Sequence, residues 1–366
     1  MAESAVESVV PQKRRVVFVV GSGRSGTSTV AGALQALGMH VPQPEVVADE
    51  TNPKGFGEPQ WVVDLHTELL GRCNVQVSDS RPTAWYDAGK LAHLERLRTR
   101  LSTWLEEQFV EAGDAPELVV KDPRLAWFVG LWRSAALRCD AVPSYVTMLR
   151  PPAEVVGSKQ RYYTAKAGEV QRTAAWINMM LHTERATRGS ARAFVRYADL
   201  LDDWTVPVFG FGQRFDLAAV TTAQANDIRK VHSFIDPSLR RVQLTWDDLE
   251  VPKRLVELAD ATWEQLDLLA TPDGDVPAVH DELDKIRAAY AETYEEAEAI
   301  AQSTAVASYR EGVASAPAAA GPAAPGTSGA ERVPHAVRAM VPAGARRGLR
   351  KALGRERPEQ AQPGQG

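Results

Sequence analysis

The sequence predicts an α/β fold, in which helices cover both faces of a mostly parallel sheet in a three-layer α/β/α arrangement. Two observations support this prediction. Short runs of β-branched and other apolar residues recur along the chain and alternate with helical patterns, the order typical of parallel sheets. The first such run, residues 16–20, leads directly into a glycine-rich turn and then a helical pattern that stops at Gly38.

The remaining elements follow the same alternation. Strands are predicted at residues 16–20, 117–121, 144–149 and 192–197. Helices are predicted at residues 27–37, 91–110, 127–138, 152–166 and 170–188. After residue 199 the strand patterns fade, and residues 253–269 and 279–302 have helical patterns.

Bulk composition limits the function. The chain has 366 residues, of which 44% are hydrophobic, enough for a sizeable core. A net charge of −5 argues against nucleic acid as the main partner. Cys73 and Cys139 have neither a metal-ligand spacing nor the pattern of a disulfide framework, so a reducing compartment is expected. With no apolar run long enough for a membrane span and no secretory signal, the expected location is cytoplasmic.

We expect three parts. Residues 1–14 form a polar arm, residues 15–308 form one domain, and residues 309–366 form a disordered Ala/Pro-rich and basic tail. Two interpretations of the basic segment 332–357 remain open: a solvated tail, or a segment that touches an anionic membrane surface or a partner. The second interpretation would make the protein membrane-peripheral.

The strongest motif is the loop Gly-Ser-Gly-Arg-Ser-Gly-Thr-Ser-Thr at residues 21–29. Backbone N–H groups and a helix dipole converge in such a turn and favour an anion. The spacing imitates a Walker loop, but Thr27 stands where that loop needs lysine, and the cation is Arg24. The glycines also satisfy the dinucleotide fingerprint, which remains a competing interpretation.

A second motif runs from Tyr145 to Ser158. A predicted strand ends at Arg150, and a helix that begins near Pro152 carries Ser158. Arg150 and Ser158 are predicted to face one crevice and to offer a guanidinium and a hydroxyl to a phosphate. The alternative is a strand-end arginine in an ordinary salt bridge.

Together the two motifs resemble the PAPS-dependent sulfotransferases, where PAPS is 3′-phosphoadenosine 5′-phosphosulfate. The match is closest to the carbohydrate and tyrosylprotein types and to a bacterial sulfotransferase-like group, and it implies a P-loop-like sulfotransferase fold. The resemblance implies a 5′-phosphosulfate loop formed by Gly23, Arg24, Ser25, Gly26, Thr27 and Ser28. It implies a 3′-phosphate site formed by Arg150, Ser158, Arg161 and Tyr197. Tyr162 stands where the family often has arginine, so Arg161 is carried over from the neighbouring position.

The same resemblance supplies catalytic candidates. Lys121, in a Lys-Asp-Pro sequence like that of tyrosylprotein sulfotransferases, would assist at the transferring group, while Asp122 would orient it or touch the acceptor. Glu58, followed by Pro and then Trp61 as in carbohydrate sulfotransferases, would be the general base. Other candidates for the base are Glu45, Asp49, Asp122 and His66.

The sequence therefore predicts an enzyme that moves a sulfuryl group from PAPS, without a metal, to a hydroxyl of a small molecule, glycan or glycolipid. One alternative is a P-loop kinase that uses ATP, against which Thr27 argues. Another is a non-catalytic binding module that retains the nucleotide loop.

Overall fold

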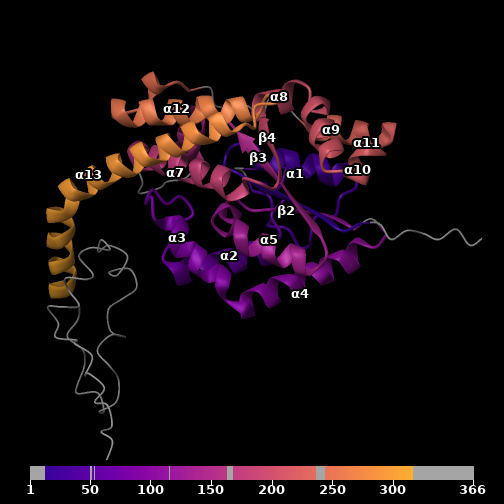
Figure 1. Ribbon diagram of the computed structural model, residues 1–366, viewed down its shortest axis with the longest axis horizontal. Coiled ribbons are helices and arrows are strands. Elements are labelled where there is room, and N and C mark those ends of the chain that lie inside the picture. The colour runs from indigo at the N-terminus through magenta and orange to yellow at the C-terminus, as the bar shows by residue number, and fades with distance from the viewer. Residues whose placement is uncertain are drawn as a thin grey trace, which may run out of the picture. The chain divides into compact units, whose positions relative to one another are not determined.

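Four parallel strands form a sheet in the part of the chain that the computed structural model describes, residues 13–49, 52, 54–114, 116–162, 168–235 and 244–315. The strands are β1 (Arg15–Val20), β2 (Glu117–Lys121), β3 (Val142–Leu149) and β4 (Ala191–Arg196). Their spatial order is β2-β1-β3-β4. Figure 1 labels β2, β3 and β4 of this sheet. Every pairing in this sheet is parallel, as the sequence predicts.

The central strand β1 shows why these residues form a sheet. Its sequence is RVVFVV, and its residues from Val16 to Val20 are all buried. A strand covered on both faces needs apolar side chains in both directions, and β-branched residues suit the extended backbone. Phe18 points into the core on one face, and Val17 and Val19 point into the core on the other.

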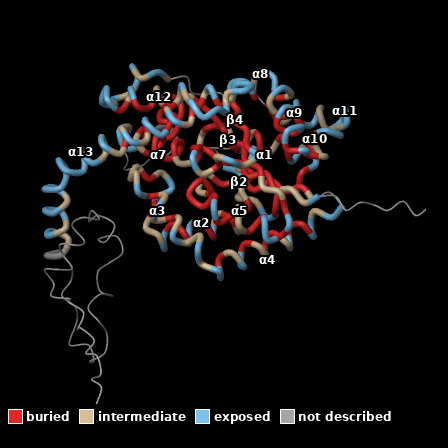
Figure 2. Tube along the Cα trace, in the orientation of Figure 1, coloured by how far each residue is buried: buried red, intermediate tan, exposed pale blue. Residues whose placement is uncertain are grey.

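Helices cover both faces of the sheet, which confirms the predicted three-layer α/β class. On the Phe18 face pack α2 (Gln60–Cys73), α3 (Ala84–Gly89), η2 (Pro123–Phe128), α4 (Glu95–Ala112) and α5 (Val129–Arg138). On the opposite face pack α1 (Thr27–Ala36), α8 (Tyr197–Asp202), α9 (Thr205–Arg214), α10 (Ala218–Thr221) and α11 (Ala225–Phe234). Figure 2 shows the buried residues concentrated in the sheet and in the helix faces turned toward it.

A third apolar cluster joins the end of β3 and part of β4 to further helices. It contains residues of α6 (Pro152–Tyr162), α7 (Glu169–Thr187), α12 (Lys253–Leu269) and the first part of α13 (Pro277–Ser315). Short 3-10 helices lie at Lys90–His93 and Trp246–Asp248. The chain divides into two compact units, Met1–Ala291 and Glu292–Gly366, and the site described below lies in the first.

The parallel register fixes where a ligand can bind. Val20 at the end of β1 pairs with Thr147 of β3, and Val19 pairs with Lys121 at the end of β2. The segments that follow β1, β2 and β3 therefore leave the sheet at one edge. In open α/β sheets this carboxyl edge is the usual place for ligands.

The predicted elements agree with the structure except near their ends. Tyr197 begins α8 instead of ending β4. The helix after β3 ends at Tyr162, and residues 163–166 of the predicted helix lie outside the described residues. The short helices between residues 197 and 234 were not predicted, because they are only 4–10 residues long.

The predicted C-terminal boundary needs one correction. Helix α13 continues through residues 309–315, which the sequence assigned to the disordered tail. This part of the helix contains good helix formers and a single glycine, Gly312, and the first proline follows at 317. Residues 1–12 of the arm and 316–366 of the tail lie outside the described residues. The domain bounds 15–308 otherwise remain a prediction.

The described helices include none that combines the length and the apolar character that a bilayer crossing requires.

Candidate functional site

The turn between β1 and α1 is tightly wound and buried. Gly21 and Gly26 have φ angles of 117° and 90°. A Cβ atom on Gly21 would lie 2.9 Å from the carbonyl oxygen of Met148, and one on Gly26 would lie 2.2 Å from the ring of Tyr197. Only glycine fits where the loop passes β3 and where Tyr197 covers it.

This loop offers hydrogen-bond donors to a ligand. Gly26 caps α1 without a side-chain hydrogen bond, so the first backbone N–H groups of the helix lack an acceptor within it. The buried hydroxyl of Ser25 has no hydrogen-bond partner among the described residues. Amide groups, a hydroxyl and the positive end of a helix dipole together favour a phosphate or sulfate.

The second motif meets the loop, as predicted. Arg24 Nε donates a hydrogen bond to Ser158 Oγ at 3.2 Å, and Arg150 Nη1 donates one to the carbonyl oxygen of Arg24 at 3.1 Å. Arg150 Nε also donates to the Glu154 carboxylate at 2.8 Å, which holds the guanidinium in place. The two guanidinium groups and the Ser158 hydroxyl thus come from distant parts of the chain to one place.

Tyr197 completes this group. Its ring centroid lies 5.3 Å from the Arg150 guanidinium carbon, and the same ring covers Gly26. Tyr197 is only 6% exposed, because its ring packs between the loop and Arg150. A place for Tyr197 beside the 3′-phosphate or the adenine remains a prediction.

A buried lysine approaches the start of α1 from the end of β2. Lys121 Nζ donates hydrogen bonds to Ser28 Oγ at 3.2 Å, to the carbonyl oxygen of Phe56 at 3.0 Å and to Glu58 Oε1 at 2.5 Å. The Lys121 side chain is 3% exposed and that of Glu58 12%. Asn52 Nδ2 donates to the same Ser28 hydroxyl at 3.1 Å. Glu58, 30 residues beyond Ser28 in the sequence, is therefore adjacent to the loop through Lys121.

Asp122 is fully buried, and its neighbours occupy both of its oxygens. His66 Nδ1 lies 2.8 Å from Oδ2, and the Arg124 backbone N–H and guanidinium donate to the carboxylate at 2.9 and 3.1 Å. Burial by itself would raise the pKa of Asp122, but its hydrogen bond with His66 and the charge and hydrogen bonds of Arg124 hold it below its usual value. Asp122 is thus placed to hold the Lys121 segment rather than to take a proton.

His66 has a defined tautomer. Trp132 Nε1 donates to His66 Nε2 at 2.8 Å, so Nε2 is an acceptor and the ring proton lies on Nδ1, facing Asp122. The His66 side chain is fully buried. With both nitrogens occupied, His66 lacks the access that a general base needs.

Replacement of His66 tests this chain of hydrogen bonds. The variant His66→Ala removes a donor to the buried Asp122 carboxylate and leaves a cavity beside Trp132. We expect a loss of about 2–4 kcal/mol in the free energy of unfolding. Urea denaturation measures it, with the exposed His93→Ala as control. A loss below about 1 kcal/mol would contradict a structural role for His66.

The other candidate bases are less well placed than Glu58. Glu45 accepts hydrogen bonds from Gln35 and Gln43. Asp49 is exposed and closes a turn with Asn52. Among these carboxylates, Glu58 is linked to Ser28 at the start of α1 through Lys121.

A lysine that the sequence analysis missed lies on the other side of the loop. Lys159 follows Ser158 in α6, and its Nζ donates to the hydroxyls of Ser22 at 3.1 Å and Ser78 at 3.4 Å. Burial, together with the nearby charge of Arg172, lowers the pKa of Lys159 to about 8. A lysine beside a serine in a helix is common, so no sequence pattern distinguished Lys159.

The remaining predicted residues occupy different surroundings. Gly23 lies beside the Pro123 ring, with 3.7 Å between that ring and a Cβ built on the glycine, and Thr27 is buried at the start of α1. The side chain of Arg161 lies outside the described residues.

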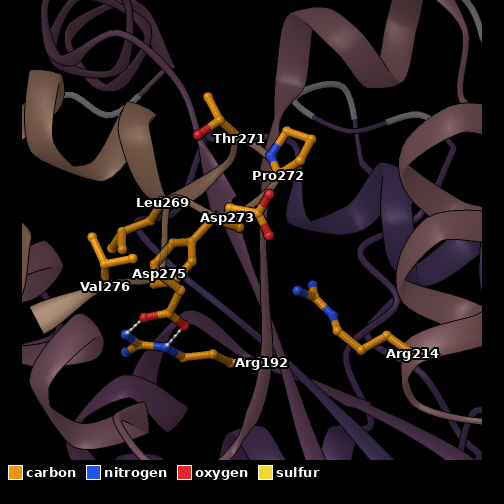
Figure 3. A pocket seen from close by; sticks show the side chains of 9 residues that line it. Arg192, Arg214, Leu269, Thr271, Pro272, Asp273, Asp275 and Val276 are labelled. Carbon is orange, nitrogen blue, oxygen red and sulfur yellow. Dashed lines mark hydrogen bonds and ion pairs between the residues drawn. The ribbon is translucent and has the colours of Figure 1, made fainter.

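A cavity of about 360 Å³ lies away from this loop, at the amino end of β4 (Figure 3). Arg192 and Asp275 face each other across two hydrogen bonds of 2.6 and 2.8 Å on its wall, and Arg214 points toward it from the end of α9. None of the predicted site residues lines this cavity. It is therefore separate from the candidate site.

The fold and the loop define the class of protein as an α/β protein with a parallel sheet and a glycine-rich turn between its first strand and first helix. No protein-family model matches the chain, and no curated protein matches its sequence. Among solved structures, it is similar to the sulfotransferase domain of the Synechococcus PCC 7002 olefin synthase, with 17% identity, a TM-score of 0.42 and coverage of 68% of this chain and 95% of that one.

Two further solved structures are similar at the same level. For the sulfotransferase domain from the curacin biosynthetic pathway the identity is 16%, the TM-score 0.40 and the coverage 69% of this chain and 98% of that one. For a sulfotransferase from Mycobacterium tuberculosis H37Rv the identity is 15% and the TM-score 0.38, and the match covers 69% of this chain and 77% of that one. Likenesses with TM-scores below 0.5 are too weak to assign a family or an activity to this chain.

Proposed function

We propose that the protein is a sulfotransferase that moves a sulfuryl group from PAPS to a hydroxyl acceptor. The observation that carries this proposal is the contact between two motifs that lie far apart in the sequence. Arg150 donates to the backbone of Arg24, and Arg24 donates to Ser158. A donor with phosphate groups at both ends needs cations and hydroxyls for each end, and the contact between these two motifs supports an assignment of one motif to each.

The loop would hold the 5′-phosphosulfate end. Its donors are the backbone N–H groups at the start of α1, the Ser25 hydroxyl and Arg24. Arg150, Ser158 and Tyr197 would hold the 3′-phosphate and the adenosine, with Arg161 as a further candidate. A 3′-phosphate distinguishes PAPS from ATP, so the Arg150 group would determine which nucleotide binds.

Sulfuryl transfer requires stabilisation of the negative charge on the leaving group and a general base for the acceptor hydroxyl. An acceptor oxygen forms a bond to sulfur while the bond from sulfur to the 5′-phosphate oxygen breaks, and negative charge grows on that leaving oxygen. Arg24, Lys121 and the loop N–H groups would stabilise this charge, and the burial of Lys121 supports that role. Glu58 would take the acceptor proton, and Asp122 would hold the segment that carries Lys121.

The acceptor class remains part of the proposal: a small molecule, glycan or glycolipid, in a cytoplasmic protein that needs no metal or nucleic acid. We also propose that the basic segment 332–357 contacts an anionic membrane surface. A kinase function is less well supported, because Thr27 replaces the Walker lysine. A non-catalytic module would have no use for the buried pair of Lys121 and Glu58.

Nucleotide binding tests the 3′-site. We expect adenosine 3′,5′-bisphosphate to bind more tightly than ADP, and Arg150→Ala to weaken bisphosphate binding about 10- to 100-fold, since a charge-assisted hydrogen-bond pair is lost. Isothermal titration measures both affinities.

The control for that titration is Arg254→Ala, which removes an exposed arginine in α12. ADP binding that is unaffected by Arg150→Ala and tighter than bisphosphate binding would favour the kinase. Unchanged bisphosphate affinity in Arg150→Ala would remove the 3′-site assignment.

A further inference from the structure

Beside the loop lies a buried cation, Lys159, that the proposed reaction does not use. Lys159 projects from α6 to Ser22, and Arg172 lies in the first turn of α7, which packs against α6, with relative exposures of 9% and 7%. The charge of Arg172 acts on Lys159 and helps to lower its pKa. Ser22 is fully buried and Ser78 half-buried, so the ammonium group of Lys159 has two hydroxyls as its neighbours.

Neither cation has a carboxylate partner in the described part of the chain. The neighbouring acid, Asp79, pairs with Arg81 at 2.7 Å. Two buried like charges without a counter-ion destabilise a fold, because burial removes hydration and the charges repel each other. The depressed pKa of Lys159 has this same cause. An arrangement of this kind is stable when an anionic ligand occupies it.

The proposed function assigns the two anionic ends of the donor to other cations. In that proposal Arg24 and Lys121, which contact the loop and its helix, would bind the 5′-phosphosulfate, and Arg150 would bind the 3′-phosphate. Lys159 approaches the loop at Ser22, whereas Lys121 approaches it at Ser28, at the start of α1. A further anion near the transferring group must then come from the second substrate.

We propose that Lys159, Arg172 and the hydroxyls of Ser22 and Ser78 form an oxyanion subsite for an acidic group of the acceptor. The group is a carboxylate, a sulfate ester or a phosphate ester, which two cations and two hydroxyls can bind. The acceptor is then an acidic molecule whose hydroxyl lies beside the loop. The assignment to an acceptor rests on the proposed function, whereas the subsite itself does not.

Inorganic sulfate is the probe for this subsite. Full-length protein is saturated with adenosine 3′,5′-bisphosphate, and sulfate is added at constant ionic strength while thermal unfolding is followed. We expect saturable stabilisation in the wild type and in the control Lys285→Met, which removes an exposed lysine. In Lys159→Met and Arg172→Met the apparent affinity for sulfate should fall at least tenfold. Equal affinity in all four proteins, or no saturable binding in the wild type, would overturn the subsite.

Proton uptake provides a second readout. Bound sulfate favours the charged form of Lys159. Sulfate binding near pH 8 should therefore take up about half a proton from the buffer, and sulfate binding near pH 6 should take up almost none. Titration calorimetry in two buffers of different ionisation enthalpy measures this uptake. Uptake that persists in Lys159→Met would contradict the role of that lysine.

Replacing the bisphosphate with PAPS tests whether the subsite binds an anionic group of the acceptor or of the donor. If the subsite serves the acceptor, sulfate binds alongside PAPS with unchanged affinity, and Lys159→Met leaves PAPS affinity within about twofold of wild type. Displacement of sulfate by PAPS would instead assign the two cations to the donor and overturn the acceptor assignment. If neither nucleotide binds the wild type, the sulfotransferase proposal and the acceptor assignment fail together, and sulfate binding without nucleotide still decides the subsite.

Discussion

Replacing Arg24 with alanine is expected to lower turnover by about 10²–10³, the usual effect of removing one donor to a charge that develops in the transition state. Arg24 Nε already reaches Ser158 at 3.2 Å, and the Arg24 carbonyl oxygen accepts from Arg150 at 3.1 Å. The measurement is transfer from labelled PAPS to the best acceptor in a panel of sugars, lipids and phenols, with acidic and neutral members in matched pairs.

This variant should lose activity without losing its fold. Arg24 has a φ angle of 75°, a strained conformation for arginine and alanine alike, so the substitution changes the backbone preference little. Arg24→Lys, which keeps the charge but not the planar guanidinium, should retain intermediate turnover. Wild-type turnover in Arg24→Ala would contradict a catalytic role for the loop cation, and Arg254→Ala serves as the matched control.

Lys159→Met is expected to stabilise the ligand-free protein by about 2–3 kcal/mol at neutral pH. The pKa of Lys159 is about 8 in the folded protein, against a usual value of 10.5. Below pH 8 lysine is charged in both folded and unfolded chains, and the folded protein carries the full penalty of burying the charge. Methionine has a similar volume and no charge.

The sign of the pH dependence follows from the same values. Between about pH 8 and 10.5 the unfolded chain binds more protons than the folded one, so wild-type stability rises with pH across this window relative to Lys159→Met. The difference between the two proteins should then nearly vanish above about pH 10.5. Urea denaturation at pH 7, 9 and 10.5 measures it, with Lys285→Met as the control. A variant less stable than wild type at pH 7 would show that the hydrogen bonds to Ser22 and Ser78 outweigh the burial penalty.

The Lys159 and sulfate experiments together separate stability from binding. A variant that is more stable and yet fails to bind sulfate has lost a ligand contact and not its structure. Such a trade between stability and binding is common at functional sites, where a charge that a ligand will neutralise is left buried.

Local sequence patterns were sufficient to predict the sheet. The run of β-branched residues before Gly21 predicts a buried strand, and the loop that follows predicts a helix start, because both depend on neighbours within a few residues. The segment after residue 199 was less well predicted, since its short helices are stabilised by packing on the sheet rather than by a long periodic pattern.

The candidate site was partly predictable for the same reason. Arg24, Arg150 and Lys121 each end or follow a predicted strand, and in a parallel sheet such positions meet at one edge. Lys159 and His66 have no such position. Each gains its surroundings from segments far away in the sequence, Lys159 from Ser22 and Ser78, and His66 from Asp122 and Trp132.

By itself, the sequence determined the α/β alternation, the glycine loop and the cations at three strand ends, because these depend on local backbone preference and on the period of the apolar residues. Only the tertiary structure decided which side chains share an environment. The physical reason is that burial and hydrogen bonding depend on long-range packing. That packing closed Asp122 and His66 to a ligand and linked Glu58 to the loop through Lys121. It also left Lys159 and Arg172 buried without a carboxylate partner among the described residues.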